Sequence, residues 1–139
     1  MRDRLIAEII QGQNPLTLPP DATLAAACEA MYRRRVGAVM VVRDADLLLG
    51  IFTGRDAVRC LAEGRKPTAK LADVMTRQPE TVTPEQHASD ALRLLNDGGF
   101  RHLPVCEDGR VRGILSRYDF RAAEHAQQDT ENGFFENLR

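Results

Sequence analysis

Several residue types on which whole classes of protein depend are scarce or missing in this chain of 139 residues. It contains no tryptophan, and aromatic residues make up only 5% of the sequence, so few rings are available to stack on unpaired bases. The net charge of −1 at pH 7 is close to neutral, whereas dedicated nucleic-acid binders are strongly basic. We therefore expect no nucleic-acid partner.

The sequence also lacks long apolar runs and a paired set of cysteines. No stretch approaches the roughly 18 apolar residues that a membrane span needs, and the first residues lack the apolar region of a secretory signal. Cys28, Cys60 and Cys106 are odd in number and widely spaced, which fits neither a disulfide framework nor a zinc site. We expect buried, reduced thiols, a cytoplasmic location, no metal and no membrane contact.

One pattern occurs twice. The stretch GIFTGRD ends one apolar run, and GILSRYD ends another 63 positions later. Thr53 and Asp56 of the first copy thus correspond to Ser116 and Asp119 of the second. Upstream the offset is 64, because the preceding turn reads DAD in the first copy and DG in the second. Hairpin turns tolerate such an insertion, so we interpret the two copies as an internal repeat.

Each copy predicts a β-α-β-β-α unit. Apolar residues recur at helical spacing after Leu24 and after Ala88, and two short apolar strands joined by a turn follow each helix. Asp21 or Thr23 can cap the first helix, and Gly98-Gly99 ends the second. A single unit has an apolar face too small to be buried alone, so an α/β (α+β) fold is expected, with the two repeats packed face to face.

The repeats divide the chain into five predicted segments. These are an N-terminal helix (1–12), the first repeat (13–64), a linker with a short helix (65–75), the second repeat (76–124) and a C-terminal tail (125–139). The N-terminal helix carries an apolar stripe, which we expect to dock on the body of the chain or on a second subunit: Leu5, Ile6, Ile9 and Ile10. The tail, with Phe134, Phe135 and Leu138, is either frayed or makes an exchanged contact.

The repeated hydroxyl and carboxylate have two interpretations. Ser/Thr-x-x-Asp is a capping box, in which the hydroxyl accepts from a first-turn amide and the acid bonds to the amide of the cap residue. A strand that leads directly into a helix also directs free amides at phosphate, and an aspartate there can accept hydrogen bonds from the two hydroxyls of a ribose. The glycines that begin the motifs, Gly50 and Gly113, allow another backbone or a flat ring to approach closely.

Two β-α-β-β-α copies with G-hydrophobic-hydrophobic-T/S-x-x-D at the second strand–helix junction resemble a tandem pair of CBS (cystathionine β-synthase) domains. RHLPV, residues 101–105 of the second copy, is also typical of that family. The resemblance covers about residues 13 to 123. It implies a pseudo-twofold module with two clefts between the repeats, which in this family commonly bind adenosine ligands, and which often dimerises.

The resemblance also implies the ligand contacts. Asp56 and Asp119 become ribose ligands, Thr53 and Ser116 contact sugar or phosphate, Arg101 and His102 lie near phosphate, and Arg55 and Arg117 add positive charge. The first copy has Gly37 and Ala38 at the positions of Arg101 and His102, so we expect the two clefts to be unequal.

The other candidate residues have simpler explanations. Arg33-Arg34-Arg35 ends the first helix of its repeat, where cations are favoured, and is expected to be a solvated helix end. His102 has no partner that would make it a catalytic base, and His87 and His125 stand alone rather than forming a metal site. Phe100 is expected to belong to the core, with Leu103 and Val105.

We therefore expect a regulatory, energy-sensing module rather than an enzyme. Its ligand would be AMP, ADP or ATP, with S-adenosylmethionine and NAD as further candidates, and it would act as a homodimer on an unidentified partner protein. The alternative is a ligand-free scaffold for dimerisation, in which both Ser/Thr-x-x-Asp motifs only cap helices.

Overall fold

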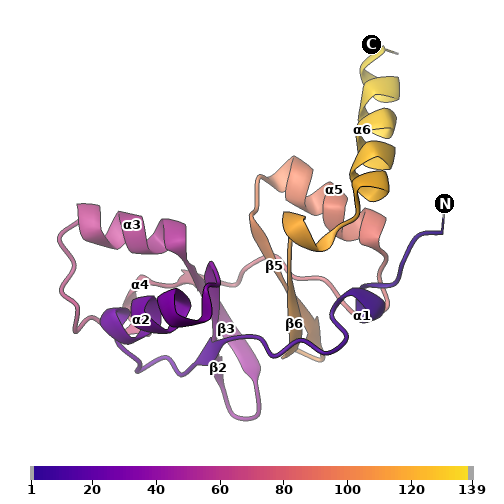
Figure 1. Cartoon of the computed structure of the whole chain (residues 1–139). Coiled ribbons are helices and arrows are strands. Elements are labelled where there is room, and N and C mark those ends of the chain that lie inside the picture. Colours follow the sequence, from indigo (N-terminus) through magenta and orange to yellow (C-terminus); the bar gives the residue numbers. More distant parts are fainter. Residues whose placement is uncertain (1, 138–139) are drawn as a thin grey trace.

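The computed structural model describes the backbone of residues 2–137 and the side chains of residues 2–130. The elements along the chain are α1 (Ile6–Ile9), β1 (Thr17–Leu18), α2 (Leu24–Arg34), β2 (Ala38–Arg43), β3 (Leu47–Thr53), α3 (Gly54–Ala62), α4 (Leu71–Val74), β4 (Thr76–Arg77), α5 (Ala88–Gly98), β5 (His102–Glu107), β6 (Arg110–Ser116), the 3-10 turn η1 (Arg117–Asp119) and α6 (Ala122–Asn137). Figure 1 shows two groups of elements side by side, one around β2 and β3 and one around β5 and β6.

The first repeat forms the β-α-β-β-α order that its sequence predicts. Thr23, not Asp21, caps α2 by accepting a hydrogen bond from the amide of Ala26 at 3.1 Å. In the second repeat, Gly99 ends α5 in the left-handed conformation with φ of 67°, a backbone geometry that glycine adopts without steric cost. Both predicted helix boundaries are confirmed.

The second repeat departs from the predicted order at its two ends. Its opening segment forms only an isolated parallel bridge between Val82 and Val105. Its Ser-x-x-Asp motif begins a single 3-10 turn rather than a helix, because Phe120 is extended (φ −102°, ψ 146°) and its side chain is buried in the core of the repeat. The helix α6 starts only at Ala122.

The strands form one continuous sheet in the order β1-β2-β3-β6-β5, with β4 beside β3. The two repeats meet in it at their hairpin turns, where Leu47 pairs with Arg110. The Arg110 guanidinium also donates to the carbonyls of Asp44 at 2.7 Å and Ala45 at 2.8 Å. The extra residue of the first repeat therefore lies in the turn that accepts hydrogen bonds from Arg110 of the second repeat.

Three apolar clusters make up the core. One lies inside the first repeat, one inside the second, and a third joins Met40 and Val42 of β2 to Cys106 and Val111 of the second repeat. The third cluster is the apolar contact between the repeats that the sequence predicts. Cys60 and Cys106 are buried free thiols as expected, whereas Cys28 is only half-buried.

The short helix that precedes each repeat packs on the other repeat. Helix α1 covers the second repeat: Ile6 is fully buried there, and its amide donates to the carbonyl of Gln86 at 2.8 Å. Helix α4 covers the first repeat in the same way, with the Leu71 amide donating to the carbonyl of Ala22 at 2.8 Å. The apolar stripe thus docks on the body of the same chain.

The glycines of the repeated motifs make room for these covering segments. A Cβ on Gly50 would lie 2.7 Å from the carbonyl oxygen of Thr76, and one on Gly113 would lie 2.7 Å from Oε1 of Gln13 and 2.8 Å from Cβ of Ile10. Such distances are shorter than van der Waals contact. The close approach anticipated at both glycines is therefore made by other parts of the chain itself.

Candidate functional site

A pocket of about 1060 Å³ lies between the two repeats. The first repeat contributes the segment before β1 and the turn from α2 to β2. The second repeat contributes the end of α5 and the facing ends of β5 and β6, with η1 beyond them. The lining includes Gln13, Asn14, Pro15, Leu16, Arg34, Arg35, Val36, Gly37, Ala38, Asn96, Phe100, Arg101, His102, Ile114, Ser116, Arg117, Tyr118, Asp119 and His125.

The structure brings together the candidate residues of the second repeat. Arg101, His102, Ser116, Arg117 and Asp119 all line this pocket. They come from neighbouring strand ends, because His102 is directly paired with Ser116 across β5 and β6. Sequence reasoning placed these five side chains in one site, and their convergence follows from the hairpin register.

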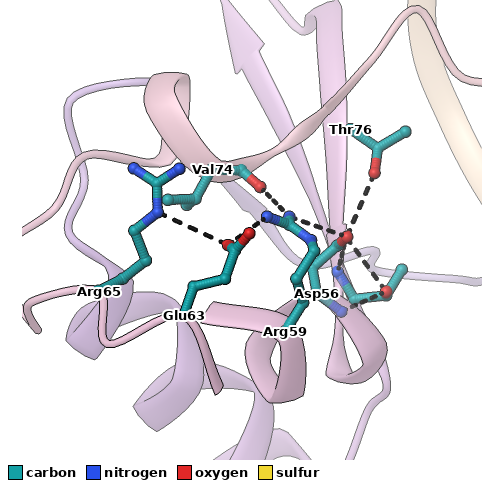
Figure 2. A network of polar contacts seen from close by, with 7 residues as sticks. Asp56, Arg59, Glu63, Arg65, Val74 and Thr76 are labelled. Carbon is teal, nitrogen blue, oxygen red and sulfur yellow. Dashed lines mark hydrogen bonds and ion pairs between the residues drawn. The ribbon is translucent and has the colours of Figure 1, made fainter. Parts of the chain in front are cut away.

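The candidate residues of the first repeat lie elsewhere. Thr53, Arg55 and Asp56 are at the start of α3 and are not among the residues that line the pocket. Figure 2 shows Asp56 within a network of polar contacts made by its own repeat and by the linker. The two sites therefore differ as predicted, and they differ by more than the presence of Gly37 and Ala38 in place of Arg101 and His102.

Asp119 completes a capping box but keeps one oxygen available. Its Oδ2 accepts hydrogen bonds from the Ser116 amide at 2.7 Å and from the Ser116 hydroxyl at 3.4 Å. Among the described residues, every hydrogen bond to this carboxylate ends on Oδ2. Oδ1 is thus the atom of the motif that can still accept a donor from a bound molecule.

His102 is held neutral beside Asp119. Burial lowers the pKa of its imidazole, the nearby Asp119 carboxylate partly opposes this effect, and Arg101 makes a further contribution that lowers the pKa. Its Nδ1 is buried without a hydrogen-bond partner among the described residues. A Cβ on Gly37 would lie 3.2 Å from Cε1 and Nε2 of this ring, so the glycine of the first repeat makes room for the histidine of the second.

The pocket has two arginines that sequence reasoning assigned only to a solvated helix end. Arg34 and Arg35 end α2 as predicted, and they line the pocket as well. Arg34 donates from Nη2 to the carbonyl of Asn14, and Arg35 is in the left-handed conformation with φ of 55°. A non-glycine residue in that conformation was not evident from the sequence, although its counterpart in the second repeat is Gly99.

Two further expectations need correction. Phe100 is 39% exposed and lines the pocket instead of joining Leu103 and Val105 in the core, because it follows the left-handed Gly99 that ends α5 and turns the chain outward. His125 also reaches the pocket, where its Nε2 lies 3.0 Å from the carbonyl oxygen of Arg117. No motif marked it, since it belongs to α6 beyond the repeat.

The balance of charge in the pocket is strongly positive. Its lining contains Arg34, Arg35, Arg101 and Arg117 but a single carboxylate, that of Asp119. Guanidinium groups bind phosphate through paired charge-assisted hydrogen bonds. Apolar surface near β1 and β6, including Leu16, Val36 and Ile114, is available to a flat ring. The site can therefore hold a polar molecule that has both an apolar ring and negative charge.

The described residues offer no metal site and no membrane-spanning helix. Within residues 2–130, no three His, Cys, Asp or Glu side chains converge closely enough to hold a metal ion. No helix in the described part of the chain combines the length and the apolar character needed to cross a bilayer.

These features define a tandem module of two related repeats with a ligand-sized cleft between them. The family model of the CBS domain matches the chain twice, at residues 6–63 and 71–126. The chain belongs to the CBS domain family, as the repeated motifs indicate.

A curated relative and two solved structures illustrate the similarity. The CBS domain-containing protein CBSCBSPB3 of Arabidopsis thaliana is 44% identical over 102 residues, which are 72% of this chain and 18% of that protein. The chain thus spans about a fifth of the length of this relative. The family match is to a CBS domain and not to a catalytic family.

Both solved structures share the fold at low sequence identity. The CBS domain protein PAE2072 from Pyrobaculum aerophilum, complexed with AMP, has a TM-score of 0.81 at 21% identity, covering 91% of this chain and 98% of that one. The CBS domain pair of protein MJ0100, in complex with 5-methylthioadenosine and S-adenosyl-L-methionine, has a TM-score of 0.80 at 20% identity, covering 91% and 99%.

Proposed function

We propose that this chain is a regulatory module that binds an adenine nucleotide in the pocket between its repeats and signals to a partner protein. One observation carries the proposal: the pocket combines the free oxygen of Asp119, an apolar wall and four arginines. The fold neighbours complexed with AMP and with S-adenosylmethionine support an adenosine ligand.

Each part of the ligand has a chemically suited part of the pocket. Oδ1 of Asp119 accepts hydrogen bonds from the 2′ and 3′ hydroxyls of the ribose, and the Ser116 hydroxyl lies beside the Asp119 carboxylate. The base lies against the apolar side chains of Leu16, Val36 and Ile114. Phosphate groups are directed toward the arginines, where neutral His102 contributes hydrogen-bonding capacity without charge.

The charge of the pocket favours nucleotides over S-adenosylmethionine. The latter carries a positively charged sulfonium, which the surrounding guanidinium groups would repel. ATP and ADP carry several negative charges that the arginines neutralise. We therefore infer that ATP and ADP bind more tightly than AMP, and that S-adenosylmethionine and NAD bind less tightly than ATP.

A path from the pocket to α6 is built into the second repeat. Arg4 donates to the carbonyl oxygen of Asp119 at 3.2 Å and to the carboxylate of Glu124 at 2.6 and 2.9 Å. A ligand that repositions Asp119 would change the contacts of Arg4, and through Glu124 those of α6. We infer that α6 is the element that carries the signal.

An exposed apolar face supports the expected homodimer. Val58 and Leu61 on α3 are 69% and 83% exposed, and Tyr32 on α2 is 84% exposed. Large apolar side chains exposed on a surface are typical of interaction sites where they form a patch, and Val58 and Leu61 lie three residues apart on one helix. Light scattering during size-exclusion chromatography tests this part: Leu61→Lys should convert a wild-type dimer to a monomer, and a monomeric wild type would contradict it.

Thermal shift with a panel of nucleotides tests the binding proposal. A ligand at 100 times its Kd stabilises a protein by about 2.7 kcal/mol, which raises the Tm of a chain of this size by roughly 10 °C. The panel should include AMP, ADP, ATP, NAD, S-adenosylmethionine and guanine nucleotides. If none of them shifts the Tm of folded, ligand-free protein, binding is contradicted, and the dimerisation scaffold becomes the better account of the two capping boxes.

A matched pair of variants locates the site. Asp119→Asn should weaken ATP binding by about tenfold or more, since it removes charge-assisted hydrogen bonds to the ribose. Asp90→Asn is the control, because Asp90 completes a similar box by accepting from the His87 amide at 2.9 Å, outside the pocket. Equal ATP affinity of the two variants in calorimetry would show that Asp119 only caps its turn.

A further inference from the structure

The carboxylate of the first repeat is occupied by donors from its own chain. Oδ1 of Asp56 pairs with Nη2 of Arg59 at 3.3 Å and accepts from the Thr76 hydroxyl at 3.3 Å. Oδ2 accepts from the Thr53 amide at 2.9 Å and from the Thr53 hydroxyl at 3.2 Å. Both oxygens of Asp56 are therefore engaged, whereas at Asp119 only one is.

Arg59 is itself fixed on three sides. Its Nη2 also donates to the carbonyl of Val74 at 2.7 Å, and its Nη1 pairs with Oε1 of Glu63 at 3.2 Å. Figure 2 shows its guanidinium between Asp56, Glu63 and Val74. Charge-assisted hydrogen bonds of this kind are stronger than neutral ones. A ligand that needs Asp56 has to displace an arginine held by the helix, the linker and the carboxylate together.

The second repeat lacks the donors that engage the second oxygen of Asp56. The residue at the position of Arg59, 63 residues later, is Ala122, whose methyl group has no donor. Thr76 pairs with Ile51 of β3, whereas the corresponding Ile114 of β6 is bonded by the side-chain amide of Gln13, with two hydrogen bonds of 2.9 Å. Among the described residues, no arginine side chain forms a hydrogen bond or ion pair with the Asp119 carboxylate.

We propose that Arg59 is an intramolecular latch on Asp56, so that each chain binds one nucleotide, in the pocket of the second repeat. The latch rests on the proposed nucleotide binding, and it assigns the first repeat a supporting role. Val74 contributes to the latch from the linker and Thr76 from β4, directly after the linker.

Calorimetric titration with ATP tests the latch through its stoichiometry. We expect one ATP per wild-type chain, loss of at least tenfold in affinity in Asp119→Asn, and no more than a twofold change in Asp56→Asn. Arg59→Met keeps the aliphatic length but removes the donors, and should bind a second ATP per chain. That second event should disappear again in the double variant Arg59→Met/Asp56→Asn.

The matched control is Arg65→Met, another arginine of the same network. Arg65 pairs with Glu63 at 3.7 Å and makes no described contact with Asp56, so this variant should bind a single ATP. Far-UV circular dichroism and thermal melts establish that each variant is folded.

The outcomes separate the latch from the proposed function. Two ATP per wild-type chain, or one ATP in folded Arg59→Met, overturns the latch while nucleotide binding stands. No ATP bound by the wild type overturns the proposed function of the second cleft. In that case, binding gained by Arg59→Met alone would still support the latch, and no binding by either protein would end both proposals.

Discussion

The two repeats of this chain carry the same Ser/Thr-x-x-Asp motif at the end of equivalent strands, and they surround it differently. In the first repeat α3 starts at once, so Arg59 lies one helical turn beyond Asp56 and pairs with it. In the second, η1 is followed by extended Phe120, and α6 begins only at Ala122. The capping motif thus gives both repeats the same local backbone at the strand end. Whether its carboxylate can accept a donor from a ligand depends on the residue one helical turn later.

The strongest way to disturb this difference is to break the ion pair found only beside the second motif. Arg4 and Glu124 are 12% and 7% exposed, whereas the corresponding positions of the first repeat hold Ala69 and Leu61. Removing one member of a buried pair leaves an unpaired charge, so Arg4→Gln should lower the free energy of unfolding by about 3 kcal/mol. Urea denaturation measures it.

The exposed pair of Arg2 and Glu8 supplies the control, because Arg2→Gln should leave the urea midpoint almost unchanged.

The buried ion pair of Arg4 and Glu124 also predicts a pH effect on stability. Hydrogen bonding to Arg4 lowers the pKa of Glu124 below its ordinary value of 4.5, so its stabilisation is present above that pH and is lost as the pH falls through the lowered pKa. Arg4→Gln should make the acid limb of the stability curve shallower, and an unchanged limb would contradict the assignment.

A second, smaller effect is expected at the turn that ends α2. Arg35 is left-handed where the second repeat has Gly99, and this conformation costs a non-glycine residue roughly 1–2 kcal/mol. Arg35→Gly should therefore raise stability, by about 1 kcal/mol at most once the greater chain entropy of glycine is counted. It should also weaken ATP binding several-fold, since a cation leaves the pocket.

Stability and affinity that fall together would show that Arg35 serves packing rather than the ligand. Arg33→Gly is the comparison variant, because Arg33 pairs with Glu29 on the solvent side of α2 and does not line the pocket. It should leave ATP affinity unchanged.

The smallest effect concerns His102, which faces Gly37 and has Ala38 as its counterpart in the first repeat. Because burial lowers the pKa of His102 from 6.5, the unfolded chain takes up a proton before the folded chain does. Stability should then decline as the pH falls from about 7 to about 5.5. His102→Gln should reduce that decline. Equal slopes for the two proteins in urea titrations would mean that His102 titrates freely.

Much of the second site could be predicted because it depends on local sequence. The motif and the strand pairing place Ser116, Asp119, Arg101 and His102 together once the hairpin forms, and hairpin register follows from turn length. The Asp56–Arg59 pair also has a local sequence signal, because opposite charges three residues apart on a helix lie on the same face. That local pattern does not indicate the contributions of Val74 and Thr76, because both reach the pair from outside the helix.

The remaining features depend on contacts between distant segments. The docking of α1 on the second repeat joins Ile6 to Gln86, and the path to α6 joins Arg4 to Glu124. No local pattern specifies which of two similar repeats a short apolar helix will choose. The sequence predicts Arg35 as a helix end, but its left-handed backbone and its place in the pocket depend on how the two repeats meet.

The exchange of covering helices has a consequence for synthesis. The first repeat has all its parts once the ribosome has passed Arg77, because α4 and β4 complete it. The second repeat needs α1, which precedes the whole first repeat in the chain, and the surface that α1 covers includes β6 of the second repeat. During translation the apolar side chains of α1 therefore have no partner until the second repeat is made, and the pocket is complete only when the segment after α1 lies beside β6.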